Sequence, residues 1–253
     1  MSPNDLSLLL GLVLAHLIGD FVLQPRRWVE ERIRRQHRSR HLLHHVGVHA
    51  CLTAVVLLVA FRLMPGAPGL LAAFAGAAGV AISHWLIDLV KAKLPGKLRW
   101  FLLDQALHLL VLAAVWLIWL GSTAPLAMLL EWLVAAQTLG LIVAYLLITR
   151  PVSIMIGLVM RRWSQQLETP GTLAEAGARI GMLERFLVLT LVLLDQLTAV
   201  GFLLAAKSVL RFGDLKSAQD RKLTEYVLLG TLLSVASTLA LGLLLRLLMT
   251  GPV

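Results

Sequence analysis

Long apolar runs alternate with short polar stretches along this chain. The runs cover approximately residues 6–23, 42–63, 70–90, 101–120, 126–149, 183–206 and 226–248. Each is close to the roughly 20 residues that a helix needs to cross the hydrocarbon core of a bilayer. Helix is expected because a lone segment in lipid must satisfy its own backbone hydrogen bonds, and the sequence lacks the alternating strands of a membrane barrel. The pattern predicts an all-α, polytopic transmembrane helical bundle of about seven spans.

Composition agrees with a membrane protein. Of the 253 residues, 58% are hydrophobic and 15% are charged, and the mean hydropathy is +0.83. Soluble domains carry roughly 25% charged residues, so a soluble fold of this composition would have too little polar surface to cover itself. The single Cys51 excludes an intramolecular disulfide framework and a cysteine-rich zinc module.

The first apolar run differs from a secretory signal peptide. Asp5 stands where a basic region would come before the run, and no small-x-small cleavage site follows it. The run also contains His16 and Asp20, which a signal peptide would not need. We therefore expect an uncleaved membrane helix.

The net charge of +9 is concentrated in short loops. Seven arginines lie within residues 24–41, and three lysines with one arginine lie within residues 91–99. The turns at 65–69 and 121–125 carry no charge. An excess of Lys and Arg marks cytoplasmic loops. The distribution predicts a bacterial inner-membrane protein with its N-terminus outside and both basic loops in the cytoplasm. It favours contacts with membrane lipids and no nucleic-acid partner.

The second half of the chain is less regular. Arg150-Pro151 interrupts the apolar stretch after residue 126, and Pro forces a kink or a stop in a helix. A broken or re-entrant segment there would leave six simple spans and keep the later basic residues in the cytoplasm. We expect four parts: a four-helix membrane domain (1–121), a connecting membrane helix kinked at Pro151 (122–163), a polar linker (164–178) and a C-terminal two-helix membrane domain (179–253).

Each of the first four runs carries two residues, each either His or Asp, at positions four apart. The pairs are His16/Asp20, His45/His49, His84/Asp88 and Asp104/His108. Residues four apart share one helix face. With a rise of about 1.5 Å per residue, all four pairs fall in one layer about 6–8 Å inside the cytoplasmic edge. The sequence predicts two tiers of side chains. The deeper tier is His16, His49, His84 and His108, and the shallower is Asp20, His45, Asp88 and Asp104.

These eight side chains are candidate metal ligands. A single such group can be satisfied by a polar partner on another helix, but ionisable groups in a bilayer are costly and usually functional. Three carboxylates in one layer repel one another unless cations or protons neutralise them. Imidazole with carboxylate suits zinc, manganese or iron. We expect a divalent metal cofactor, with two ions favoured because one ion cannot use eight ligands, although some of the eight could orient the others.

Further polar residues could contact a substrate or orient the ligands. The candidates are Gln24, His41, Gln105, Arg185, Lys207 and Arg211. Gln24 and His41 extend the pair-bearing faces by one turn toward the cytosol, and Gln105 neighbours Asp104. The three basic residues of the second half fit a phosphate-binding rim, a docking network or ordinary anchoring at the membrane surface.

Three segments carry a family resemblance. They are His16-Leu-Ile-Gly-Asp20, Ser83-His84-Trp-Leu-Ile-Asp88 and Asp104-Gln105-Ala-Leu-His108. Over residues 6–120 the chain resembles an uncharacterised bacterial inner-membrane family of unknown function, and the run from Ile180 to Ser234 looks like the extension of its longer members. The His/Asp-bearing helices are also loosely similar to the YdjM-like membrane-bound metal-dependent hydrolases. That second likeness implies a reaction class without a substrate.

The leading functional hypothesis is a metal-dependent hydrolase, phosphoesterase-like, acting on an amphiphilic or phosphorylated substrate. A paired metal site activates water and polarises a phosphoryl oxygen. Asp20, Asp88 and Asp104 are the expected catalytic carboxylates, as ligands or as a general base. The alternatives are a divalent-metal transporter or sensor, a membrane di-iron oxidoreductase, and a haem or quinone carrier. The apolar outward halves of the helices count against transport.

Overall fold

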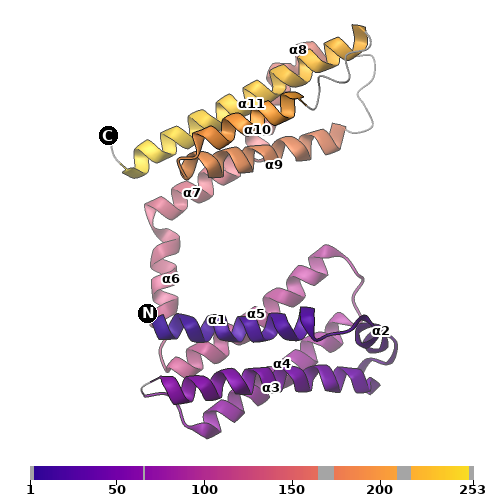
Figure 1. Cartoon of the computed structure of the whole chain (residues 1–253), viewed down its shortest axis with the longest axis vertical. Coiled ribbons are helices and arrows are strands. Elements are labelled where there is room, and N and C mark those ends of the chain that lie inside the picture. Colours follow the sequence, from indigo (N-terminus) through magenta and orange to yellow (C-terminus); the bar gives the residue numbers. More distant parts are fainter. Residues whose placement is uncertain (1–2, 65, 165–173, 210–217, 251–253) are drawn as a thin grey trace. The chain divides into compact units, whose positions relative to one another are not determined.

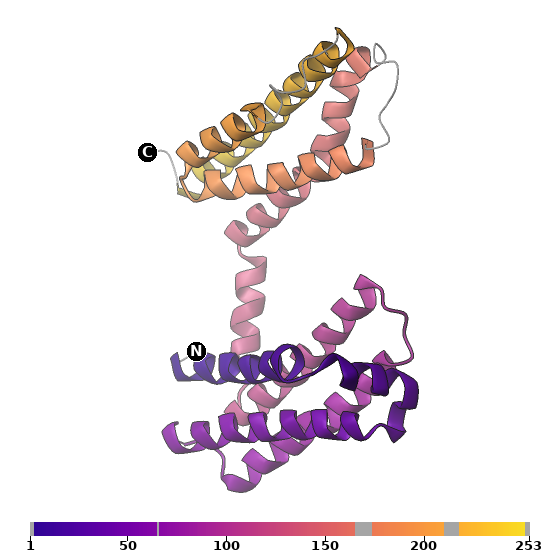
Figure 2. The same cartoon turned by 45° about the vertical axis from the view of Figure 1, so that its right-hand side comes forward.

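The computed structural model describes residues 3–64, 66–164, 174–209 and 218–250. Those residues are almost entirely helical and contain no strand, which confirms the predicted all-α class. The chain forms two compact units, residues 1–129 and 130–253 (Figure 1, Figure 2).

The first unit is a four-helix bundle with one extra helix at its end. Its elements are α1 (Pro3–Leu17), a π-helical turn η1 (Ile18–Val22), α2 (Arg26–Arg35), a 3-10 turn η2 (Gln36–Arg38), α3 (Arg40–Leu63), α4 (Leu70–Lys91) and α5 (Leu98–Leu120). Both α3 and α5 pack against α1 and α4, so the four long helices close a ring (Figure 1). The short α2 packs on α3 where α1 ends and α3 begins. We call this end, which holds residues 23–41 and 91–99, the basic end.

Local chemistry sets the ends of these helices. Ser39 precedes α3, and its hydroxyl accepts a hydrogen bond of 3.2 Å from the backbone N–H of Leu42. A serine here satisfies one of the N–H groups that a helix start leaves unpaired. Gly121 ends α5 in the left-handed region, with φ of 60°, which glycine adopts without steric cost. Ser39 thus sets where α3 begins, next to the site described below.

Apolar side chains fill the bundle away from the basic end and also cover its outside. The buried cluster contains Leu8, Leu12, Leu57, Ala60, Ala73, Val80, Leu112, Trp116 and Trp119. Leu14, Val55 and Ile82 are more than half exposed, and such faces suit lipid rather than water.

Within the part of the chain that the structure describes, six helices are long and apolar enough to cross a membrane. They are Asn4–Val22, Arg40–Leu63, Leu70–Lys91, Leu98–Leu120, Ala136–Ser164 and Lys222–Met249. The protein is a multi-pass membrane protein.

The second unit is built around one long helix. The remaining elements of the chain are α6 (Ala124–Val134), α7 (Ala136–Leu147), α8 (Arg150–Ser164), α9 (Ala174–Leu193), α10 (Leu197–Val209) and α11 (Ala218–Thr250). α11 contacts α7, α8 and α9, and α10 packs on α9 (Figure 1). Two small apolar cores, around Leu189 and around Val192, join α7, α9, α10 and α11.

Two predicted spans differ from the structure. The run 126–149 is broken by extended backbone at Ala135, between α6 and α7. The prediction of a single span over 183–206 is wrong, because α9 ends at Leu193 and α10 begins at Leu197. The chain turns at Asp195, whose φ is 61°, a conformation that Asp tolerates better than most residues. Arg246 pairs with the Asp195 carboxylate at 2.5 Å, so a charged turn interrupts a stretch that hydropathy reads as continuous.

A helix break lies just before Pro151, and a buried arginine stabilises it. The α7 helix ends at Leu147 and α8 begins at Arg150. Arg185 on α9 is 4% exposed, and its Nε donates to the Ile148 carbonyl at 2.5 Å. Its Nη2 donates to the Thr149 carbonyl at 3.2 Å. The side chain also donates to two hydroxyls, those of Ser153 and Ser234. Arg185 therefore supplies donors to backbone carbonyls at a break where the helix has fewer of its own.

Replacing Arg185 with methionine is expected to destabilise the second unit. A hydrogen bond from a charged donor contributes about 1.5–3 kcal/mol, so the loss of several should lower the free energy of unfolding by at least about 2 kcal/mol. Thermal unfolding in detergent measures the change. The control is Arg179→Met, because Arg179 is an exposed arginine on the same helix. Equal stability losses in the two variants would contradict the capping role.

Candidate metal centre

The four His/Asp pairs meet inside the first unit at its basic end. Three groups have ligand atoms that all lie within 4.8 Å of one another. They are His16, Asp20, His49 and His84; His45, His84 and Asp88; and Asp88, Asp104 and His108. Seven of these eight residues are buried, and Asp20 is partly buried. The structure thus brings together all eight predicted ligands, while metal binding stays a prediction.

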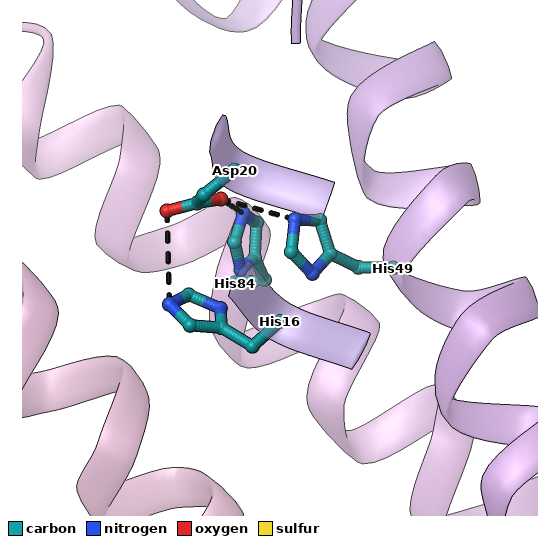
Figure 3. A group of neighbouring side chains, drawn as sticks. All are labelled: His16, Asp20, His49 and His84. Atoms are coloured by element: carbon teal, nitrogen blue, oxygen red, sulfur yellow. Dashed lines mark hydrogen bonds and ion pairs between the residues drawn. The ribbon is translucent and has the colours of Figure 1, made fainter. Parts of the chain in front are cut away.

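The Asp20 carboxylate is the centre of the histidine cluster. Its Oδ1 lies 3.0 Å from His49 Nε2, 3.3 Å from His45 Nε2 and 3.6 Å from His84 Nε2. Its Oδ2 lies 3.7 Å from His16 Nε2. Figure 3 shows Asp20 facing the rings of His16, His49 and His84. Four imidazoles from three helices therefore face one carboxylate.

The four rings of the deeper histidine tier lie in a continuous chain of contacts. The ring centres of His49 and His84 lie 3.8 Å apart, and those of His84 and His108 lie 4.2 Å apart. His16 stacks on His108 with 5.0 Å between ring centres. These contacts agree with the single layer that the pair spacing predicts.

The position of Asp20 depends on the π-helical turn. The Leu23 N–H donates to the Ile18 carbonyl at 2.9 Å, five residues back, so the chain carries one residue more than an α-helical turn would. Such bulges often occur at functional sites. Gly19 lies in this turn, and a Cβ placed there would be 2.5 Å from His49 Nε2. Glycine therefore leaves the space that the His49 ring occupies beside Asp20.

Gln105 links two of the carboxylates. Its Nε2 donates to Asp20 Oδ2 at 3.1 Å and lies 3.3 Å from Asp104 Oδ2. Its Oε1 lies 3.4 Å from His16 Nε2. The sequence made Gln105 a candidate to contact a substrate or to orient the ligands, and these contacts place it between the group that contains Asp20 and the group that contains Asp104.

The orientation of His108 is set by its own helix. Its Nδ1 lies 2.8 Å from the Asp104 carbonyl oxygen, and because a carbonyl only accepts, Nδ1 carries the proton. The Nε2 of the neutral ring is then an acceptor, and it is buried without a hydrogen-bond partner among the described residues. A backbone carbonyl commonly fixes a metal-binding histidine in this tautomer.

Two cations in the cluster were missed by the sequence analysis, which counted both as loop charges. Arg32 of α2 forms an ion pair with Asp88, and Lys91 Nζ donates to Asp104 Oδ2 at 2.6 Å. Lys91 lies three residues after Asp88 on one helix face, a signal that could have found it. No comparable signal exists for Arg32, because its place depends on how α2 folds back over the bundle.

These ion pairs correct the expected charge balance. Three carboxylates face two strong cations, so the formal sum is −3 + 2 = −1 before any histidine is protonated. Asp88 and Asp104 are already neutralised by protein side chains. Asp20 is the carboxylate of this cluster without a described Arg or Lys partner, and it faces the histidines instead.

The spacing of the donor atoms around Asp20 fits a bound ion. Metal–nitrogen bonds of about 2.0–2.1 Å place neighbouring ligands roughly 3.0–3.4 Å apart. The donor separations from Asp20 Oδ1 to His49 and His45 are 3.0 and 3.3 Å, and His45 Nε2 lies 3.0 Å from His84 Nε2. The separations from Asp20 to His84 and His16, 3.6 and 3.7 Å, are slightly longer than this range. Two facing imidazole nitrogens need a shared proton or a cation between them. The residues present therefore fit zinc, manganese or iron.

The other candidates lie apart from this centre. His41 Nε2 lies 3.0 Å from Glu31 Oε2, and its ring stacks on Trp28 with 5.7 Å between centres, so His41 attaches α2 to α3. No described contact joins Gln24 to the cluster. Lys207 donates to Glu184 Oε2 at 2.6 Å within the second unit. Arg185 contacts the helix break described above, and Arg211 lies outside the described residues.

Fold and site together define a multi-pass helical membrane protein with a buried centre of histidines and aspartates. Residues 8–136 match the model of a family described as protein of unknown function, DUF3307, and the chain belongs to this family. The matched region contains all eight residues of the centre. This confirms the resemblance to an uncharacterised family. No curated protein and no solved structure matches the chain, and the likeness to YdjM-like hydrolases gains no support.

Proposed function

We propose that the first unit is a metal-dependent hydrolase of the bacterial inner membrane, with its centre near the cytoplasmic face and an anionic amphiphile as substrate. The observation that carries the proposal is the convergence of four histidines on the Asp20 carboxylate inside a membrane bundle. Ionisable groups at such a depth are costly unless they serve a function.

The residues divide into holding and reacting groups. His16, Asp20, His49 and His84 hold one divalent cation, which supplies Lewis acidity and activates water when it is bound. Asp104 Oδ1 is buried without a hydrogen-bond partner among the described residues, so it is placed to accept a proton as general base. Asp88 with Asp104 and His108 forms the second position expected for a dinuclear site. A cation bound there would compete with Arg32 and Lys91, and Asp104 would then be a ligand instead of the base.

The orientation follows from the loop charges. The basic end carries the arginines of residues 24–41 and the lysines of 91–99, and such loops face the cytoplasm, which leaves the N-terminus outside. The centre then lies just inside the cytoplasmic leaflet, where the head of an anionic amphiphile meets positive charge.

Transport of a divalent metal is the rival function, because it would use the same ligands. A translocation path needs polar groups on the far side of the site. The buried cluster of Leu12, Leu57, Leu112 and their neighbours instead fills the space between the same four helices with apolar side chains. This packing favours hydrolysis over transport. A di-iron oxidoreductase would also use histidine and carboxylate ligands. The identity of the bound metal distinguishes this function from hydrolysis.

The metal content of purified wild-type protein tests the proposal. After reconstitution with zinc, manganese or iron, elemental analysis should find one or two ions per chain. The loaded protein should release phosphate from phosphatidic acid in mixed micelles. Metal content at background would overturn the metal centre. Bound metal with flux into liposomes and without phosphate release would replace the hydrolase with a transporter.

A further inference from the structure

The α2 helix buries one of its arginines and exposes the others. Arg32 is 8% exposed, whereas Arg26, Arg27, Arg34 and Arg35 are exposed. A buried guanidinium is costly unless its donors are used. The burial of Arg32 therefore points to a partner at the centre of the bundle.

The described contacts of Arg32 leave donors unused. Its Nη1 pairs with Asp88, while its Nε is buried and has no hydrogen-bond partner among the residues that the structure describes. A guanidinium offers five N–H groups in a planar fork that matches two oxygens of one phosphate. One carboxylate thus uses only part of the capacity of this side chain.

Lys91 reaches the same place from α4. Its Nζ donates to Asp104 Oδ2, and its side chain is 20% exposed, so a ligand entering from the basic end would meet it. The two carboxylates that face Arg32 and Lys91 have ligand atoms within 4.8 Å of each other. The two cations therefore converge on one small region beside the Asp20 group.

We propose that Arg32 and Lys91 form an anion subsite for a phosphate monoester group. This inference rests on the proposed function and names the charged part of its substrate. The phosphate replaces Asp88 and Asp104 as the partner of the two cations, and the unused Arg32 Nε–H donates to a phosphate oxygen. The freed carboxylates then lie next to the metal-holding group.

Contacts outside the centre hold Arg32 in position. The preceding residue, Glu31, pairs with His41 at 3.0 Å, and Trp28 stacks on the same His41 ring. These contacts attach α2 to α3 one turn before His45. The placement of Arg32 is therefore built into the fold of this helix.

Phosphate binding to the full-length, zinc-loaded protein tests the subsite. Isothermal titration with inorganic phosphate in detergent forms one arm. Binding to phosphatidic acid vesicles, compared with phosphatidylcholine vesicles, forms the other. Arg32→Gln and Lys91→Gln should each weaken binding by about tenfold or more, since each removes one partner of a buried charge pair. Arg34→Gln, on the exposed face of α2, is the matched control and should bind as wild type.

The outcomes separate the subsite from the metal centre. Loss of binding in Arg32→Gln with zinc content retained supports the subsite, whether inorganic phosphate, the lipid or both bind wild type. Wild-type binding in Arg32→Gln and in Lys91→Gln, with zinc retained, overturns it. If Arg32→Gln does not fold, Lys91→Gln decides alone. Absence of zinc from wild type overturns the proposed function instead.

Discussion

Replacing Asp20 with asparagine is expected to remove the bound metal from the purified protein. Asp20 faces four imidazoles and is the carboxylate of the centre without a described Arg or Lys partner, so its negative charge is available to a cation. Loss of residues that merely orient a ligand commonly costs 10–100-fold in metal affinity, so a ligand should cost at least about tenfold. Elemental analysis and zinc titration measure the change.

The control for this substitution lies on α1, the helix that leads into the π-helical turn of Asp20. Asp5→Asn makes the same change at the opposite end of α1, away from the centre, and should leave the metal content at the wild-type value. Asp104→Asn should have a smaller effect than Asp20→Asn, because Lys91 already neutralises Asp104. Equal metal contents in loaded wild type and Asp20→Asn would remove Asp20 from the ligand set.

Replacing Gly19 with alanine is expected to disrupt the centre without removing a ligand. The new methyl group would lie 2.5 Å from His49 Nε2 and 3.0 Å from Nδ1, so the ring must move away from Asp20. Overpacking of this kind typically costs about 1–3 kcal/mol in stability. The metal content should fall as in Asp20→Asn, and the thermal unfolding midpoint should drop.

A second glycine provides the matched control. Gly47 lies on α3 between His45 and His49, and a Cβ there would meet nothing within 4 Å. Gly47→Ala should keep its metal, and alanine in a helix interior should raise stability by roughly 0.5–1 kcal/mol. Full metal content in Gly19→Ala would mean that His49 does not need its present position, and would remove it from the ligand set.

The sequence was sufficient to predict the features that depend on the spacing of residues along one helix. A lone segment in lipid must be helical, so each run of about 20 apolar residues predicts a helix. Two residues four apart share a helix face whatever the rest of the chain does, so His84 and Asp88 had to point to one neighbourhood. The loop charges then placed the pairs of antiparallel helices at one depth.

Averaging hydropathy over a window also explains why two helix breaks were not predicted. The turn at Asp195 lies inside a stretch of high average hydropathy, which hides a single charged residue. The same averaging concealed the break at Ala135, which contains no proline or glycine. Pro151 was different, because its missing N–H interrupts a helix wherever it stands within one.

The sequence by itself determined the helical membrane architecture and the eight side chains that could meet, because both follow from periodicity along a single helix. Only the tertiary structure decided which cations neutralise those side chains and how the rings fit beside them. Arg32 reaches Asp88 because α2 folds back onto α3, and the His49 ring has room beside Asp20 because Gly19 lies in a π-helical turn. These contacts join residues far apart in the chain, so their energies depend on packing that no local pattern encodes.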